Sequence, residues 1–408
     1  MDIFLNNTNI NSFDGDIVIT GSKSESSRLL ILQYFYKKLE LINLSNSDDT
    51  LTLQNALKIN NDIVNIGHAG TAMRFLTALF SSIKGIDITL TGSNRMQNRP
   101  IKVLVDALTL LGADITYLNN EGFPPLKIKG NELVKDYVSI IGNVSSQYIS
   151  ALLLIAPSLK KGLKIELLGK ITSIPYIKMT LSLLESIGVE YKWNDNIISI
   201  RPLHLVNKSE LIVESDWSSA SYYYSLVALS KNGKVKLSSF KENSLQGDSA
   251  LAEIFTNFGV KTTFIDNSIV LEKTSDFNQK KHLVFNLTNT PDIAQTIAVT
   301  CLGLGVSCGL FGLHTLKIKE TDRLKALKIE LQKFDARVRI TDDSLHLKSS
   351  ELIVKNKKSP FINTYDDHRM AMAFAPLSLK YDFTIKDADV VSKSYPEFWE
   401  HFNLITKQ

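Results

Sequence analysis

Four stretches of the chain repeat one order of apolar and polar positions. In each stretch, apolar residues at helical spacing end at a glycine or an aspartate, and two short alternating segments follow with a polar turn between them. The four sequences are LVDALTLLGADITYLNNEGFPPLKIKG, LSLLESIGVEYKWNDNIISI, LAEIFTNFGVKTTFIDNSIVLE and LKIELQKFDARVRITDDSLHLKS. The pattern predicts the same local structure four times, a helix followed by a β-hairpin.

The residues that end the four predicted helices are almost evenly spaced. They are Gly112, Gly188, Gly259 and Asp335, separated by 76, 71 and 76 positions. Glycine just past an apolar helical stripe is a common helix stop, because it adopts the left-handed conformation without steric cost. Chance recurrence is the alternative, but the spacing favours a true repeat that contains two helices and several strands. Five or six such repeats fit into 408 residues, which predicts an α/β fold with two lobes.

Composition and charge exclude several classes of protein. Hydrophobic residues make up 44% and charged residues 22%, which is typical of a globular chain and not of a disordered one. The formal net charge of +4 is small, and no basic block stands out, so we expect no nucleic-acid partner. Two cysteines, Cys301 and Cys308, provide neither a disulfide framework nor a metal-ligand pattern.

The sequence offers one apolar stretch of nearly membrane-spanning length, residues 296–313. It contains four glycines as well as serine and threonine interruptions, so it predicts a helix, a turn and a strand. The first residues, MDIFLNNTNINSFDGDI, are polar and lack the apolar core of a signal peptide. We therefore expect a soluble cytoplasmic protein with no membrane partner.

Several predicted helices begin with small hydroxyl or glycine residues, and some of these have a cation nearby. A helix start presents free backbone N–H groups and a partial positive charge, which together bind phosphate or carboxylate. Any one of them predicts simple capping by serine or threonine, but four together with Lys23, Arg28 and Arg74 favour an anion-binding surface. The four segments are GSKSESSR (21–28), GHAGTAMR (67–74), NVSSQ (143–147) and DWSSAS (216–221).

Four other segments concentrate polar side chains. In the segment 317–327, Glu320 or Thr321 is a candidate helix cap, and the remaining charged side chains would then be solvated. The Asp-Asp-His run in the segment 364–374 is a weak metal motif, because no second histidine follows at helical spacing. We therefore expect no metal. GHAGTAMR matches neither G-x-x-x-x-G-K-[ST] nor G-x-G-x-x-G, so neither an ATPase nor a dinucleotide site follows. The segments are NRMQNRP (94–100), TNTPDIAQT (288–296), KIKETDRLKAL (317–327) and TYDDHRMAMAF (364–374).

These motifs, in this order and followed by KSYPEF (393–398), resemble the enolpyruvyl transferases, and among them the EPSP synthase branch. The resemblance implies an inverse α/β barrel architecture of six βαβαββ repeats, three per lobe, with the active site in the cleft between the lobes. It places a shikimate 3-phosphate lobe at 21–213 and a phosphoenolpyruvate lobe at 1–20 and 214–408. The chain would cross between lobes near 20–21 and 213–214.

The implied reaction transfers the enolpyruvyl group of phosphoenolpyruvate to the 5-hydroxyl of shikimate 3-phosphate through a tetrahedral intermediate, without a cofactor. It is the sixth step of the shikimate pathway to chorismate and the aromatic amino acids, and the branch is a target of glyphosate. By resemblance, Asp292, Glu320 and Lys23 would transfer protons and His368 would assist. Which of them acts at which step stays open, and we expect a monomer.

The resemblance also implies two sets of binding residues. Shikimate 3-phosphate would be held by Lys23, Ser24, Arg28, Ser145, Ser146, Gln147, Ser173, Tyr176, Asp292 and Lys319. Phosphoenolpyruvate would be held by Lys23, Gly70, Arg99, Gln147, Lys319, Arg323, Arg369 and Lys393. His68, Phe75 and Ile174 stand where many members have Asn, Pro and Lys, and none of these departures removes a charge that the chemistry requires.

Two alternatives remain at this point. The sister enzyme that transfers enolpyruvyl to UDP-N-acetylglucosamine usually has a cysteine in its first lobe, and residues 1–213 contain none. Some members carry aspartate there instead, so the missing thiol does not decide the question. A non-catalytic member of the fold would have lost charged positions, yet Lys23, Asp292, Glu320, Arg323 and Arg369 are all present.

Overall fold

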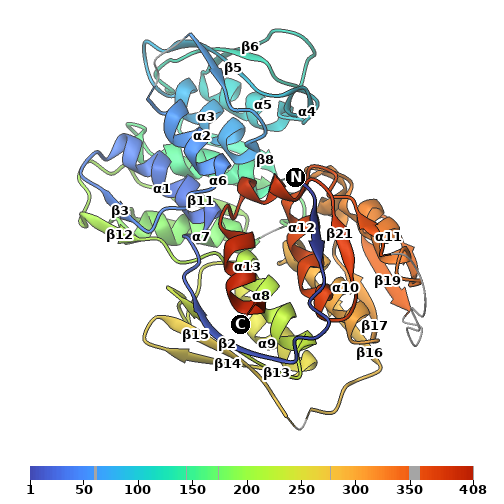
Figure 1. Cartoon of the computed structure of the whole chain (residues 1–408). Helices are drawn as coiled ribbons and strands as arrows, with labels where there is room; N and C mark the ends of the chain where they lie inside the picture. The colour runs from blue at the N-terminus through green and yellow to red at the C-terminus, as the bar shows by residue number, and fades with distance from the viewer. Residues whose placement is uncertain (59–61, 144, 173, 276, 349–358, 408) are drawn as a thin grey trace. The chain divides into compact units, whose positions relative to one another are not determined.

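The computed structural model describes residues 1–58, 62–143, 145–172, 174–275, 277–348 and 359–407. The chain divides into two compact units (Figure 1). We call Gly21–Val213 the inserted unit, because it interrupts the sequence of the other. The other, formed by Met1–Thr20 and Glu214–Gln408, is the discontinuous unit.

The inserted unit contains ten strands and seven helices among its described residues. Its strands are β3 (Glu40–Ile42), β4 (Ile63–Asn65), β5 (Asp87–Thr91), β6 (Asp114–Tyr117), β7 (Leu126–Lys129), β8 (Tyr137–Ile141), β9 (Leu163–Leu168), β10 (Tyr191–Asn194), β11 (Ile197–Ile200) and β12 (Glu210–Ile212). Its helices are α1 (Lys23–Phe35), α2 (Asp48–Ala56), α3 (Gly70–Ser81), α4 (Asn94–Gln97), α5 (Lys102–Leu111), α6 (Ser146–Ile155) and α7 (Ile174–Ser186), with one short 3-10 helix, η1 (Ala156–Ser158).

The discontinuous unit is built from the same kinds of element. Its strands are β1 (Ile3–Leu5), β2 (Ser12–Ile17), β13 (Asn232–Ser238), β14 (Val260–Ile265), β15 (Ser268–Lys273), β16 (His282–Asn286), β17 (Ser307–Phe311), β18 (Arg337–Ile340), β19 (Ser344–Lys348), β20 (Phe361–Ile362) and β21 (Phe383–Ile385). Its α-helices are α8 (Trp217–Leu229), α9 (Leu251–Ile254), α10 (Ala294–Gly303), α11 (Arg323–Gln332), α12 (His368–Phe374) and α13 (Phe398–Thr406). Its 3-10 helices are η2 (Gly247–Ala250), η3 (Phe255–Phe258), η4 (Pro291–Ile293), η5 (His314–Ile318), η6 (Ala375–Leu379) and η7 (Ala388–Lys393).

Four sheets share one strand order and one set of directions. In β4-β5-β7-β6 the first two strands are parallel and the other neighbours antiparallel, which is the path of a βαβαββ repeat. The same order recurs in β8-β9-β11-β10, β2-β13-β15-β14 and β16-β17-β19-β18. Two smaller sheets, β12-β3 and β20-β21-β1, keep part of it. The expected α/β class with a repeated βαβαββ pattern is confirmed, and each described sheet is an open row of strands.

The four predicted helix stops adopt the left-handed conformation. The φ angles are 110° at Gly112, 101° at Gly188, 72° at Gly259 and 59° at Asp335. An aspartate tolerates this region better than most residues with a side chain. The end of the second helix in a repeat is therefore determined by the residue at that position, and it does not depend on tertiary contacts.

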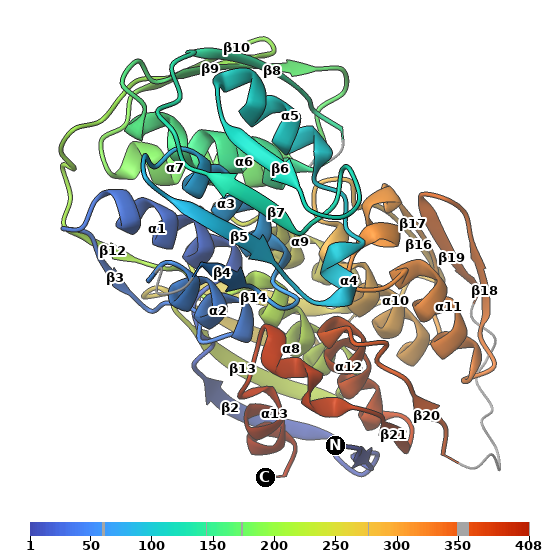
Figure 2. The ribbon, with the colours of Figure 1, turned by 90° about the horizontal axis from the view of Figure 1, so that it is seen from above.

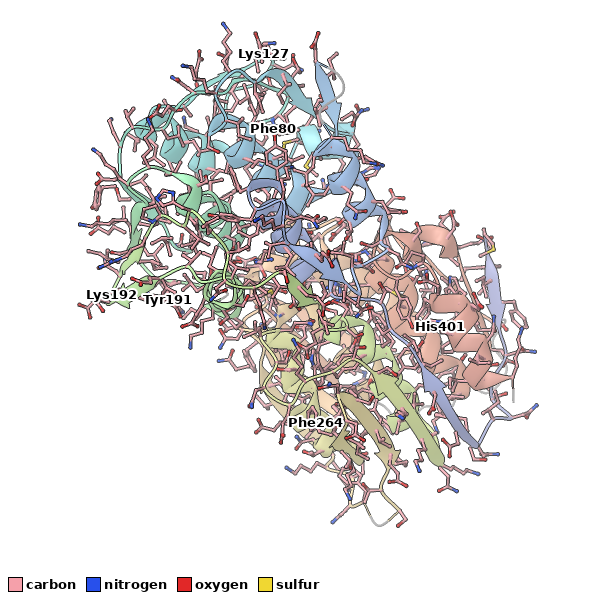
Figure 3. All side chains as sticks on the ribbon, turned by 90° about the vertical axis from the view of Figure 1, so that its left-hand side faces the viewer. Phe80, Lys127, Tyr191, Lys192, Phe264 and His401 are labelled. Atoms are coloured by element: carbon pink, nitrogen blue, oxygen red, sulfur yellow. The ribbon has the colours of Figure 1, made fainter. Side chains whose placement is uncertain are left out.

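The first helix of each repeat is the more deeply buried one. α3, α6, α8, α10 and α12 are buried along almost their whole length, and α1 is buried from Glu25 to Leu32. In the inserted unit α1, α3, α6 and α7 pack against one another, and the sheets cover them (Figure 2). Figure 3 shows Phe80 of α3 inside this unit and Lys127 of β7 at its surface. We call α1, α3, α6, α8, α10 and α12 the inner helices.

The apolar stretch 296–313 forms a helix and a strand, as predicted. α10 ends at Gly303, Gly305 turns with a φ of 68°, and β17 follows from Ser307. Within the described ranges, no helix is long and apolar enough to cross a membrane.

Candidate active site

The polar motifs of the sequence lie mostly where inner helices begin. In the inserted unit α1 begins at Lys23, α3 at Gly70 and α6 at Ser146. In the discontinuous unit η4 places Asp292 just before α10, and α12 begins at His368. The first N–H groups of a helix lack partners within the helix and carry partial positive charge. Such positions favour phosphate and carboxylate groups.

Arg323 forms the centre of a charged cluster in the discontinuous unit, where its side chain is 2% exposed. Its Nε donates to Asp367 Oδ2 at 2.6 Å, one terminal nitrogen donates to Asp292 Oδ1 at 2.9 Å, and the other donates to Glu320 Oε2 at 2.6 Å. Burial lowers the pKa of Arg323, but the three carboxylates outweigh burial and raise it overall. Arg323 is thus a fixed cation between three carboxylates.

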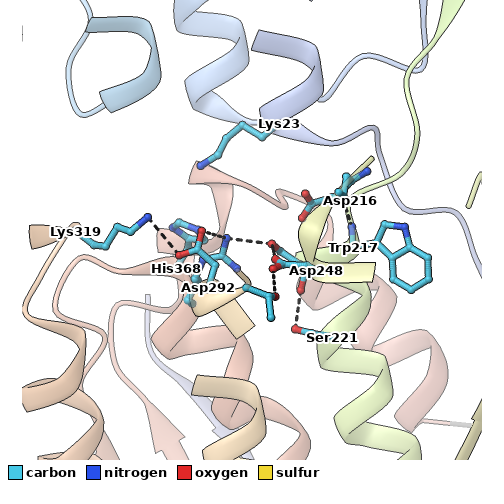
Figure 4. A network of polar contacts seen from close by, with 12 residues as sticks. Lys23, Asp216, Trp217, Ser221, Asp248, Asp292, Lys319 and His368 are labelled. Carbon is cyan, nitrogen blue, oxygen red and sulfur yellow. Dashed lines mark hydrogen bonds and ion pairs between the residues drawn. The ribbon is translucent and has the colours of Figure 1, made fainter. Parts of the chain in front are cut away.

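Asp292 is surrounded by cations from three places in the sequence. Besides Arg323, its carboxylate lies 3.4 Å from Lys319 Nζ and 3.5 Å from Arg369 Nη2 (Figure 4). Burial would raise the pKa of Asp292, but the charges of Lys319, Arg369 and Arg323 hold it well below its ordinary value. The carboxylate is therefore ionised and can accept a proton or a hydrogen bond from a substrate hydroxyl.

The start of α12 brings three further predicted residues close to this cluster. Asp367 caps the helix by accepting from the backbone N–H of Arg369 at 2.9 Å. His368 is buried, with Nδ1 3.9 Å from Asp367 Oδ1. Lys393 Nζ donates to the carbonyl of Asp366 at 2.6 Å, so the end of η7 is tied to the same turn. His368, Arg369 and Lys393 therefore belong to one local arrangement.

In the inserted unit, Lys23 has a carboxylate partner. Its Nζ lies 3.0 Å from Oδ2 of Asp49, and both side chains remain about one-fifth exposed. Asp49 lies in the first turn of α2, so the pair joins the starts of two helices. An amine held in this way at a partly open position can serve a substrate anion or transfer a proton.

Arg28 is buried, with 2% of its surface exposed, and its hydrogen-bond partners are neutral groups. Its guanidinium donates to the hydroxyls of Thr180 at 2.8 Å and Ser150 at 3.1 Å, and to the carbonyls of Ser24 at 2.7 Å and Tyr176 at 3.4 Å. Burial lowers the pKa of Arg28 to about 10. A buried cation with neutral partners raises the local positive potential, which suits a nearby anionic ligand.

A second buried arginine supports the start of α3. Arg74 donates to the carbonyls of Gly70 at 3.1 Å and Pro100 at 3.0 Å. Burial lowers the pKa of Arg74 to about 10. A Cβ on Gly70 would lie 2.5 Å from one nitrogen of the Arg99 guanidinium, so Arg99 lies directly against this glycine. The structure therefore brings Gly70 and Arg99 together.

The start of α6 gathers three predicted residues. Ser145 caps the helix by accepting from the N–H of Gln147 at 3.3 Å, and Ser146 is buried beside it. The side-chain amide of Gln147 donates to the hydroxyl of Thr71 at 3.2 Å, which links α6 to α3. Ser173, the remaining member of the predicted shikimate 3-phosphate set, lies outside the described residues.

Comparisons with known proteins decide the family. The family model described as EPSP synthase (3-phosphoshikimate 1-carboxyvinyltransferase) matches residues 53–402. A 3-phosphoshikimate 1-carboxyvinyltransferase of Bacteroides fragilis is 45% identical over 94% of this chain and 93% of its own length. One from Histophilus somni is 35% identical over 98% of both chains. The chain belongs to the EPSP synthase family.

A solved EPSP synthase structure agrees with this at the level of the fold. The protein is from Acinetobacter baumannii, and the TM-score is 0.78 over 99% of this chain and 98% of that one. The sequences are 20% identical, so this likeness concerns the fold alone.

Two of the positions that the resemblance marked as departures, Phe75 and His68, have local contacts in this EPSP synthase family member. Phe75 of α3 places its ring 5.5 Å from the Arg28 guanidinium, and thus lines the pocket of that buried cation. His68 is exposed, and its Nδ1 lies 2.9 Å from the hydroxyl of Ser93. Neither side chain displaces one of the charged site residues described above.

The cap of α11 differs from both candidates in the sequence. Asp322 caps this helix by accepting from the N–H of Lys325 at 3.2 Å, so neither candidate from the sequence, Glu320 or Thr321, is the cap. Glu320 instead turns towards Arg323. The contact with Arg323 competes with capping by Glu320, and Asp322 lies two residues closer to the helix than Glu320 does.

The inner helices of the two units begin with different charges. The inserted unit uses Ser22, Ala69 and Ser145 at the cap positions, whereas α8 and α12 of the discontinuous unit use Asp216 and Asp367. In this EPSP synthase family member, the inserted unit thus combines neutral caps with two buried arginines. The discontinuous unit combines carboxylates with the cations that balance them.

Sequence reasoning missed three carboxylates that lie around the predicted site residues. Asp49 pairs with Lys23, Asp367 pairs with Arg323, and Asp248 is buried near Asp292. For Asp367 a signal existed, since an aspartate directly before an apolar helical run is a typical cap. For Asp49 and Asp248 the sequence carried no signal, because their partners lie far away along the chain.

Proposed function

We propose that this chain transfers the enolpyruvyl group of phosphoenolpyruvate to the 5-hydroxyl of shikimate 3-phosphate and releases phosphate. The activity is that of a 3-phosphoshikimate 1-carboxyvinyltransferase in the shikimate pathway to chorismate. Family membership and the names of the curated relatives support it. The observation that carries it is the ionised carboxylate of Asp292, held beside Glu320 and three cations.

Shikimate 3-phosphate is assigned mainly to the inserted unit. Neutral helix caps and the buried Arg28 favour an anion there, and serine hydroxyls provide hydrogen bonds for phosphate or carboxylate oxygens. Asp292 and Lys319 complete the set from the discontinuous unit. The assigned residues are Lys23, Ser24, Arg28, Ser145, Ser146, Gln147, Ser173, Tyr176, Asp292 and Lys319.

Phosphoenolpyruvate carries a phosphate and a carboxylate, so it requires several cations. Planar guanidinium groups match both anions with paired hydrogen bonds. Gly70 has no side chain, which lets the Arg99 guanidinium lie directly against the start of α3. The assigned residues are Lys23, Gly70, Arg99, Gln147, Lys319, Arg323, Arg369 and Lys393.

The chemistry requires proton transfer at two atoms. The 5-oxygen of the acceptor bonds to C2 of phosphoenolpyruvate and loses its proton, while C3 gains one. The tetrahedral intermediate then expels phosphate and loses a proton from C3. We assign these transfers to Asp292, Glu320 and Lys23, with His368 assisting by hydrogen bonding. Arg323 keeps Asp292 and Glu320 in place throughout.

The decisive experiment measures phosphate release by the purified full chain. Release should require phosphoenolpyruvate and shikimate 3-phosphate together, and neither substrate alone should support it. UDP-N-acetylglucosamine should not replace the acceptor. Release with UDP-N-acetylglucosamine would instead assign the chain to the sister activity, and no release with either acceptor would indicate a non-catalytic member of the fold.

The proposal also covers the cellular compartment, the oligomeric state and the inhibition of the enzyme. Both substrates are multiply charged and do not cross a membrane unaided, so we infer that the enzyme acts in the cytoplasm, where such metabolites are made. We expect the enzyme to act as a monomer. Inhibition by glyphosate, a phosphonate with a carboxylate and an amine, is expected at the phosphoenolpyruvate residues.

A further inference from the structure

Asp248 is a buried carboxylate that lies next to the charged cluster around Arg323. The proposed chemistry gives Asp248 no role. It lies in η2, and its side chain is 4% exposed. Each of its oxygens accepts one hydroxyl hydrogen bond: Oδ2 from Ser218 and Oδ1 from Thr290. Burying a carboxylate is costly unless it is hydrogen-bonded and balanced by charge. The retention of such a group beside the candidate site requires an explanation.

The two hydroxyls connect Asp248 to the main charged groups of the cluster. Ser218 Oγ accepts a hydrogen bond from Arg369 Nη2 at 3.1 Å, and the same nitrogen lies 3.5 Å from Asp292 Oδ2 (Figure 4). Thr290 stands two residues before Asp292, at the start of the turn that carries it. One carboxylate therefore contacts both the turn that bears Asp292 and the serine that receives Arg369.

The direction of the serine proton gives this arrangement its function. A serine hydroxyl has one proton and two lone pairs. When Ser218 donates its proton to Asp248, its lone pairs remain available to the N–H of Arg369. Without an acceptor at Asp248, the proton could point towards Arg369, and a donor facing a donor would push the guanidinium away.

Asp248 also connects the starts of the three inner helices of the discontinuous unit. Ser218 is the second residue of α8, Thr290 precedes η4 and α10, and Arg369 is the second residue of α12. These elements come from three different repeats. A single buried group that contacts all three directly or through one hydroxyl can fix their relative positions to within hydrogen-bond tolerance.

We propose that Asp248 is a positioning residue for phosphoenolpyruvate, which orients Arg369 through Ser218 and fixes the Asp292 turn through Thr290. It does not touch substrate. The inference rests on the proposed function, since it assigns Arg369 to the phosphoenolpyruvate anion. If Asp248 has this role, its replacement should weaken the binding of phosphoenolpyruvate. If the carboxylate only fills the core, its replacement should lower the stability of the protein instead.

Asp248→Asn tests the inference because it keeps the size and removes one acceptor oxygen. The KM for phosphoenolpyruvate should rise about tenfold or more, the range expected for a misdirected hydrogen bond to a charged group. The KM for shikimate 3-phosphate should stay within about twofold, and kcat should fall less than the phosphoenolpyruvate KM rises. A second variant, Ser218→Ala, removes the link to Arg369 and should raise the same KM.

The double variant Asp248→Asn/Ser218→Ala provides a test that a merely structural role would not pass. If Asp248 acts through Ser218, the two changes should be non-additive, and the double variant should raise the phosphoenolpyruvate KM little more than Ser218→Ala alone. Thr290→Ser should retain wild-type kinetics, because it keeps the hydroxyl that donates to Asp248. Additive effects would overturn the route through Ser218.

Glu214→Gln is the matched control. Glu214 is another buried carboxylate near the start of α8, and it accepts from Trp217 Nε1 at 2.8 Å, from the N–H of Lys241 at 3.0 Å and from Ser244 at 2.7 Å. The same acid-to-amide change there should lower the melting temperature without a selective rise in the phosphoenolpyruvate KM.

The outcomes separate this inference from the proposed function. Wild-type protein that releases no phosphate with both substrates would contradict the proposed function. Active wild type combined with an unchanged phosphoenolpyruvate KM in Asp248→Asn would overturn the inference alone. If Asp248→Asn does not fold, Ser218→Ala decides: a selective rise in that KM supports the role, and wild-type kinetics overturn it.

Discussion

At the scale of single residues, Asp292 shows how neighbouring charges control a candidate base. Burial alone would favour its protonated form, but Lys319, Arg323 and Arg369 hold its pKa well below the ordinary value. Before substrate binds, the carboxylate is a weak base. An anionic substrate on the same cations would compensate part of their charge, which should raise the basicity of Asp292 at the moment when a hydroxyl proton must leave.

Asp292→Asn should therefore lower kcat by at least about a hundredfold, because the amide cannot take up the hydroxyl proton. The KM for phosphoenolpyruvate should stay unchanged or fall, since the three cations lose an internal anion. Steady-state kinetics with each substrate varied in turn measures both values. Near-wild-type turnover would remove Asp292 from the catalytic set without affecting the family membership.

The same variant makes a prediction about stability. A carboxylate whose folded-state pKa is depressed stabilises the protein above its unfolded pKa of about 3.9, and this contribution is lost as the pH falls below that value. Wild type should therefore exceed Asp292→Asn in melting temperature at neutral pH, and the difference should shrink below about pH 4. A difference that grows on acidification would contradict the depressed pKa.

Gly70 is a second position where one residue decides a local geometry. An alanine methyl there would meet the Arg99 guanidinium at 2.5 Å, so the flexible arginine must move. Gly70→Ala should raise the KM for phosphoenolpyruvate several-fold and the inhibition constant of glyphosate by more, since the longer inhibitor is crowded both by the methyl and by the displaced arginine. Both constants are measured with shikimate 3-phosphate saturating.

Arg99→Lys is the matched control for Gly70→Ala. It weakens the paired hydrogen bonds of the guanidinium without adding a methyl group, so it should raise both constants by similar factors. If Gly70→Ala also raises them equally, its effect comes entirely through Arg99, and the methyl does not crowd the inhibitor.

At the level of helices and strands, each repeat contains two kinds of helix, which differ in burial and in the residues at their ends. The inner helices are buried and place charged or hydroxyl side chains at their starts, whereas α5 and α7 end at left-handed glycines that turn the chain into a hairpin. The residues of the proposed site are therefore concentrated near the starts of the first helices, and the ends of the second helices turn the chain.

Gly112→Ala tests the helix-end assignment. The φ angle is 110° and an added Cβ would meet Val134 at 3.9 Å, so space is available and backbone strain dominates. The free energy of unfolding should fall by about 1–2 kcal/mol, while Gly112→Asn should lose less, because asparagine tolerates positive φ. Urea unfolding gives both values, and kcat should not change. Equal losses for the two variants would show that backbone conformation is not the cause.

At the level of the whole molecule, two units of like topology differ in how their buried charges are partnered. Each contains three related sheets. In the inserted unit Arg28 and Arg74 are buried among neutral hydrogen-bond partners, and in the discontinuous unit Asp292, Asp367 and Arg323 balance one another. A repeated architecture can therefore hold its buried charges in two different ways by changing a few helix-start residues.

The sequence by itself determined the features that depend on short stretches of chain. Apolar spacing and the four stops from Gly112 to Asp335 predicted the repeated helix and hairpin, because capping and left-handed φ depend on residues a few positions apart. The ordered motifs pointed to the family and to the main charged side chains. These inferences required no knowledge of which distant segments meet.

Only the tertiary structure decided how those side chains are held. Arg28 meets Ser150 and Thr180, which lie 122 and 152 positions away, and Asp248 meets Thr290 42 positions away. Nothing in the local sequence LQGDSA distinguishes Asp248 from a solvated loop aspartate. Hydrogen-bond partners, burial and pKa depend on which repeats pack together, and that packing is a property of the folded chain as a whole.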